Sequence, residues 1–145
     1  MPGPIDPFPT IKLTVPFLSD ILAKLRDEKS ARAMVIFQAE SAEQGEWVLQ
    51  NVAGRLSRGK ITVFGPESHR PVEIIEQALR MKATIALVGQ MRQPEDAHAM
   101  RAASGMGLKS VAYIVAKERA QYAEAVAAFG PWRSYNILSL VGKSA

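Results

Sequence analysis

Side chains that could do chemistry follow three short apolar runs of the sequence: Glu40 and Glu43, then His69 and Arg70, then Gln90 and Arg92. Cysteine is absent, which excludes disulfides and thiolate chemistry. His98 follows Asp96 by two residues, and side chains two apart do not share a helix face, so they do not predict a metal site. No Ser-His-Asp triad and no pair of catalytic carboxylates can be built from what remains. These residues leave open whether the chain binds phosphate groups.

Composition sets the broad class. The chain has 145 residues and a net charge of +4, which fits one globular domain with a buried core. Basic residues alternate with acidic ones and never run longer than two, so we do not expect nucleic acid as the main partner. The start has four prolines and no charged segment before an apolar core, unlike a signal peptide. We expect a cytoplasmic protein.

Apolar runs of strand length alternate with segments of helical periodicity. We expect strands at 31–37, 59–64, 84–89, 109–116 and 135–142, and helices at 19–30, 46–56, 71–82, 93–105 and 117–129. Ser19 is the expected N-cap of the first helix. This order predicts an α/β fold with a mainly parallel sheet and helices on both faces. Residues 1–16 form a proline-rich arm in this interpretation, and 17–145 form a single domain.

Ligands of open α/β sheets bind beyond the carboxyl ends of the strands, so three loops matter: 38–45, 65–71 and 89–94. The first occupies the place of a phosphate-binding loop, which needs glycines and a lysine. It has one glycine, no lysine, and the carboxylates Glu40 and Glu43, with Glu46 close behind. Those carboxylates suit a helix N-terminus and would repel a triphosphate. Phosphate binding of the usual kind is not expected here.

The stretch 78–105, "ALRMKATIALVGQMRQPEDAHAMRAASG", resembles the Walker B region of the type II and type IV secretion ATPases, which include the pilus-retraction motors. The matching residues are Ala78, Leu79, Arg80, Leu87, Val88, Gly89, Met91, Arg92, Ala102, Ala103 and Gly105. Upstream, "ITVFGPESH" resembles the family's Asp box, with Thr62 and Pro66 in register. The resemblance covers about 33–116 and implies a three-layer RecA-like core.

This chain departs from the family at its catalytic positions. The phosphate-binding Lys and Ser/Thr are absent, and the acidic pair of the Asp box becomes Phe64 and Gly65. The Walker B Glu becomes Gln90, the following Asp becomes Gln93, and no histidine stands in the place of the His box. An amide cannot act as a base toward water, and a triphosphate without the lysine loses its main charge partner. We therefore expect a degenerate phosphate loop, no enzymatic activity and no cofactor.

The leading hypothesis is a protein-interaction module that binds itself or an active secretion or pilus ATPase of a bacterial cell, reaching a membrane only through that partner. The candidate interaction surface comprises Glu40, Glu43, Phe64, His69, Arg70, Gln90, Met91 and Arg92. We expect Trp47 and Trp132 in the core or at its edge. We expect Met81, Met91, Met100 and Met106 as core filler, although methionine is also common at adaptable binding surfaces.

Two alternatives belong to other classes. The first is an inhibitor similar to SulA, a cell-division inhibitor family with a RecA-like fold and no phosphate loop. The segment from Phe37 to Trp47 and the residues Val72, Glu73, Ala78 and Leu79 carry that resemblance, which implies binding to the tubulin-like division protein. The second is a weak nucleotide or nucleic-acid binder that uses Lys60, Arg70 and Arg92.

Overall fold

A computed structural model describes residues 11–12, 15–27, 33–56, 62–65, 69–132, 137–141 and 143–144. Its centre is a five-stranded parallel sheet in the order β3-β4-β5-β2-β6. The strands are β2 (Met34–Ala39), β3 (Thr62–Phe64), β4 (Ile85–Gln90), β5 (Lys109–Val115) and β6 (Ile137–Leu140). The fold is therefore α/β, as predicted, and agrees with a three-layer RecA-like or Rossmann-like domain.

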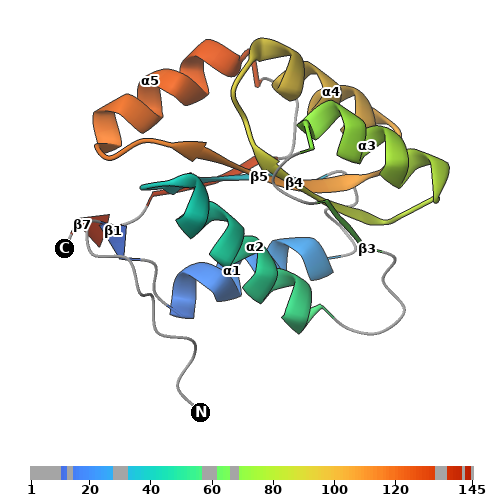
Figure 1. Cartoon of the computed structure of the whole chain (residues 1–145), viewed down its shortest axis with the longest axis horizontal. Coiled ribbons are helices and arrows are strands. Elements are labelled where there is room, and N and C mark those ends of the chain that lie inside the picture. The colour runs from blue at the N-terminus through green and yellow to red at the C-terminus, as the bar shows by residue number, and fades with distance from the viewer. Residues whose placement is uncertain are drawn as a thin grey trace.

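Helices cover both faces of this sheet (Figure 1). They are α1 (Val15–Arg26), α2 (Ala42–Arg55), α3 (Pro71–Arg80), α4 (Pro94–Gly105) and α5 (Arg119–Phe129). In the view of Figure 1, α1 and α2 lie below the sheet, and α3, α4 and α5 lie above it. Two strands, β1 (Ile11–Lys12) and β7 (Lys143–Ser144), form a separate antiparallel pair.

Each face of the sheet has its own apolar core. Side chains of α1 and α2 pack on one face around Phe37 and Tyr113, and those of α3, α4 and α5 pack on the other around Ile36 and Met100. All six residues of β2 are buried, because this strand lies inside the sheet and is covered on both faces. The long apolar run of the sequence is thus explained by a central strand.

A buried lysine connects α1 to the sheet through hydrogen bonds. The Nζ atom of Lys109, at the start of β5, donates to the carbonyls of Leu25 (2.7 Å) and Asp27 (3.0 Å). These carbonyls stand at the C-terminal end of α1, where a cation is favoured by the helix dipole.

Several predicted boundaries were wrong. Helix α1 begins at Val15 and not at Ser19, since proline at position 16 is compatible with a first helical turn. Strand β2 extends to Ala39 and α2 begins at Ala42, so the helix predicted at 46–56 starts four residues earlier. The β1–β7 pair was not predicted. Most of the arm 1–16, and residues 28–32, 57–61, 66–68, 133–136, 142 and 145, lie outside the described part of the chain, with Lys60 and Pro66 among them.

The burial of the tryptophan and methionine side chains agrees only in part with the prediction. Trp47 and Trp132 are half-buried against the two cores, and the Trp132 indole nitrogen donates to the Val126 carbonyl at 2.7 Å. Met91 and Met100 are buried, but Met81 is 52% exposed and Met106 70% exposed. The prediction of core filler was wrong for these two, because they follow the last residues of α3 and α4, where each chain segment turns toward the next strand.

Candidate functional site

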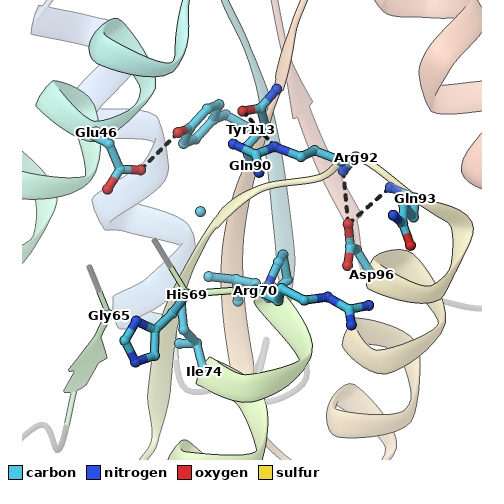
Figure 2. Close-up of a pocket in the computed structure, with 13 residues that line it drawn as sticks. Glu46, Gly65, His69, Arg70, Ile74, Gln90, Arg92, Gln93, Asp96 and Tyr113 are labelled. Atoms are coloured by element: carbon cyan, nitrogen blue, oxygen red, sulfur yellow. Dashed lines mark hydrogen bonds between the residues drawn. The ribbon is translucent and has the colours of Figure 1, made fainter. Parts of the chain in front are cut away.

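A pocket of about 160 Å³ opens at the carboxyl edge of the sheet, above β4 (Figure 2). Its lining comes from α2, the segment after β3, the start of α3, the end of β4, the start of α4 and β5. The lining residues are Glu46, Gly65, His69, Arg70, Pro71, Ile74, Val88, Gly89, Gln90, Arg92, Gln93, Asp96 and Tyr113. The loops predicted at 65–71 and 89–94 therefore meet here.

A backbone irregularity at the end of β4 aims residues into this pocket. The pairing of β4 with β5 shifts register between Leu87 and Gly89, and Gly89 has φ of +101°. Only glycine adopts that conformation without strain. Beyond the bulge, Gln90 pairs with Tyr113 across the strands and both line the pocket. Bulges of this kind re-orient side chains and occur often beside functional sites.

The connection from β4 to α4 is held by one carboxylate. Asp96, which is buried, accepts from the backbone N–H groups of Arg92 (2.8 Å) and Gln93 (3.0 Å) through Oδ2. The Nε of Arg92 in turn donates to Gln90 Oε1 at 3.1 Å. In Figure 2 the Arg92 side chain runs back from the start of α4 toward Gln90 and Tyr113. The loop thus orients a guanidinium over the pocket.

The opposite wall is formed by α2 and Tyr113. The Tyr113 hydroxyl donates to Glu46 Oε2 at 2.9 Å and lies 3.3 Å from the Ala42 carbonyl. The tyrosine ring is buried directly under α2: a Cβ on Gly45 would stand 2.4 Å from its atoms. Gly45 is therefore required by this close approach, and Tyr113 fills the space below the N-terminal half of α2.

The connection between β2 and α2 is shorter than the sequence predicted. Only Glu40 and Ser41 separate β2 from α2, in place of the eight-residue loop predicted at 38–45. Ser41 Oγ accepts from the N–H of Gln44 at 3.1 Å, and the Gln44 side chain accepts from the N–H of Glu40 at 2.7 Å. The backbone N–H groups of Gln44 and Glu40 are thus hydrogen-bonded to side chains of this connection and of α2. In a phosphate-binding loop, backbone N–H groups at this position bind the ligand instead.

The pocket also lies away from the usual ligand position of such folds. Strands β2 and β5 are neighbours whose following helices, α2 and α5, lie on opposite faces, so the topological switch point is between them. The pocket instead lies over β4, one strand further toward the edge.

Four of the eight predicted surface residues line the pocket: His69, Arg70, Gln90 and Arg92. The other four do not. Glu40 is buried beside the start of α2, Glu43 is exposed in its first turn, Phe64 packs against the core under α2, and Met91 is buried between helices and sheet.

Sequence reasoning missed Tyr113 and Asp96 and gave Glu46 no role of its own. Tyr113 lies within an apolar strand, and nothing in its neighbours along the chain shows that it pairs with Gln90. Asp96 stands three residues after Gln93 at a helix start, a capping pattern that could have identified it.

Within the described ranges, no three His, Asp or Glu side chains gather closely enough to hold a metal ion. No helix of the described segments is long and apolar enough to span a bilayer. No family model, curated protein or solved structure matches the chain.

Proposed function

We propose that this chain is a non-catalytic protein-interaction module built on a RecA-type core. The observation that carries the proposal is the two-residue connection between β2 and α2, closed by Ser41 and Gln44. Neither Glu40 nor Ser41, the two residues of this connection, is a glycine or a lysine, the residue types that hold a triphosphate in a phosphate-binding loop.

The dimensions of the pocket support the same conclusion. Sites for drug-sized ligands and cofactors measure about 300 to 1,000 Å³, and this pocket measures about 160 Å³. A nucleotide would extend well beyond it. The polar groups around it are better suited to contact with another macromolecule than to enclosing a nucleotide.

The rim offers a surface for that contact. Arg70 and Glu95 form an ion pair of 3.2 Å between α3 and α4, and their side chains are 56% and 71% exposed. His69 is also exposed. Because an exposed ion pair contributes little to folding, these residues can be exchanged without unfolding the protein. The partner in this proposal is a second copy of the chain or an active secretion or pilus ATPase, as the resemblance over 78–105 implies.

Sedimentation velocity over a concentration series, alone and with a purified pilus-retraction ATPase, tests this function. We expect a reversible complex in one of the two experiments. Arg70→Glu should weaken it by about tenfold or more, since like charges across an interface are costly. Arg80→Glu, at the opposite end of α3 and exposed, is the matched control and should have no effect.

A monomer at every concentration that also fails to bind the ATPase contradicts the proposal. Division arrest in bacteria that overproduce the chain, with direct binding to the purified tubulin-like division protein, would replace it with the inhibitor hypothesis. Equal weakening by Arg70→Glu and Arg80→Glu would place the interface elsewhere on the molecule.

A further inference from the structure

Helix α5 is anchored to the sheet by fewer buried residues than the other helices of its face. Tyr122 is the one buried residue within Arg119–Phe129, a segment described in full, whereas α3 has four buried residues and α4 has five. Ala125, Val126 and Phe129 are only partly buried against the core. Because most of the stability of a helix in a folded protein comes from its buried apolar face, α5 has the weakest such contribution on this face.

The composition of α5 does not make up for this weak packing. Alanine supplies five of its eleven residues, and Ala120, Ala123, Ala127 and Ala128 are exposed. Isolated helices shorter than about 12 to 15 residues are marginal in water even when they are rich in alanine. We therefore expect α5 to lose its helical hydrogen bonds once it leaves the sheet.

Polar contacts hold α5 at its middle and at its end. In the middle, the Tyr122 hydroxyl is hydrogen-bonded to the Ile36 carbonyl and to Ser139 Oγ, at 3.0 and 2.6 Å. At the end, Arg101 of α4 donates from Nη1 to the Phe129 carbonyl at 2.6 Å. Each such bond contributes modestly to stability, because water replaces the partner when the groups separate.

A buried amide beside the start of α5 is only half satisfied. Gln38, at the carboxyl end of β2, is 2% exposed and donates through Nε2 to the carbonyl of Ala116 at 2.8 Å. Ala116 lies between β5 and α5. Within the described ranges, Gln38 Oε1 has no hydrogen-bond partner. A buried acceptor without a donor costs free energy that water recovers on exposure, so this junction favours opening.

We propose that α5 is a displaceable cover, which leaves the sheet as a unit while the rest of the domain stays folded. The movement uncovers the carboxyl ends of β2 and β5 on this face, where Gln38 lies. These two strands flank the topological switch point, the position at which open α/β sheets bind their ligands. In the closed structure, α5 and the segment before it cover that position. This inference does not depend on the proposed partner, whose surface is tested at Arg70 on α3.

Native-state hydrogen exchange, followed by the amide signals of the isotope-labelled full chain, tests the proposal. We expect the amides of 122–129 to exchange about tenfold or more faster than the helical amides of α2 and α4, since local openings have lower free energies than global unfolding. Their rates should also rise little at low urea concentrations, because opening α5 exposes little surface.

Two variants separate local opening from global unfolding. Tyr122→Phe keeps the ring and removes the hydroxyl, and should accelerate exchange at 122–129 by about tenfold. Val48→Ala is the matched control, because Val48 is buried under α2 on the opposite face of the sheet. It should accelerate the amides that exchange through global unfolding and leave 122–129 unchanged, since α2 stays packed while α5 opens. The amide spectrum of each variant shows whether it is folded.

Equal protection and an equal urea dependence in α5, α2 and α4 overturn the proposal, because α5 would then open only when the whole domain unfolds. Acceleration of 122–129 in Val48→Ala, by the same factor as the amides of α2, also overturns it. Unchanged exchange in Tyr122→Phe contradicts the role assigned to the hydroxyl. All of these rates are measured on the isolated chain, so they are independent of whether a partner binds.

Discussion

Two corners of the same sheet edge differ sharply. At the end of β2 the chain enters α2 after two residues, and Ser41, Gln44 and Tyr113 fill the space with hydrogen bonds and an aromatic ring. At the end of β4 a bulge and a positive φ at Gly89 open the edge, and polar side chains surround a pocket. One corner is closed by the chain's own residues, and the other is available to a ligand or partner.

The two corners are connected through one residue. Tyr113 closes the first corner with its ring and orients Glu46 in the second with its hydroxyl. The same side chain therefore contributes to the packing of the closed corner and to the lining of the open one.

The largest expected effect is at Gly45. Gly45→Leu would force a side chain into the Tyr113 ring and should destabilise the protein by about 3 kcal/mol, as overpacking does in tight cores. Gly54→Leu is the matched control on the same helix, where an added Cβ meets no atom within 4 Å. It should stabilise by about 0.5 to 1 kcal/mol through helix propensity. Urea denaturation measures both, and similar effects would show that the corner is not closed as described.

The second effect depends on pH. The Tyr122 hydroxyl donates to the Ile36 carbonyl of β2 at 3.0 Å and lies 2.6 Å from Ser139 Oγ of β6, so it links α5 to these two strands on the face of the sheet opposite α2. Burial raises the pKa of Tyr122 to about 12 from 10.0.

Because the folded protein retains this proton more tightly, the stability linked to it is complete below pH about 10 and is lost as the pH rises toward about 12. The loss should amount to about 2 to 3 kcal/mol. Denaturation across pH 9 to 12, compared with Tyr122→Phe, isolates it, and parallel curves for the two proteins would contradict it.

A smaller effect is expected at the open corner. Gly89→Ala should cost about 1 to 2 kcal/mol because alanine disfavours positive φ. Gly107→Ala has a similar backbone cost at φ of +89° but lies outside the pocket. Both variants should lose stability by similar amounts in thermal denaturation. A loss at Gly107 without a loss at Gly89 would contradict the backbone conformation described at the end of β4.

The smallest effect is at the cap of α2. Ser41→Ala removes the acceptor for the Gln44 N–H and should destabilise by about 1 kcal/mol, whereas Ser41→Gly should cost only a few tenths. Chemical denaturation distinguishes the two. If Ser41→Ala left stability unchanged, the hydrogen bond would contribute nothing to closing this corner.

Much of the fold could be predicted because its signals are local. A few residues are enough to predict β2, from its apolar run, and the helix at 71–80, from the spacing of its apolar residues. The alternation of such strands and helices along the chain predicts the α/β class. The start of α1 was misplaced because Pro16 was assigned to an arm, although proline is compatible with a helix start.

The site was only half predictable. His69, Arg70, Gln90 and Arg92 stand in loops whose place follows from the topology. Tyr113 and Glu46 meet across 67 residues of chain, through packing of α2 on β5 that no short segment encodes. The β2–α2 connection was predicted to be too long because polar Gln38 and small Ala39 were assigned to the loop. Both residues are buried in β2.

We propose that the corner between β2 and α2 does not bind nucleotide. Titration calorimetry with ATP and with ADP, each with Mg²⁺, tests it directly on protein of verified mass. We expect no saturable heat up to millimolar nucleotide. Binding with a micromolar Kd would contradict it, because the two residues between β2 and α2 would then still hold a phosphate chain.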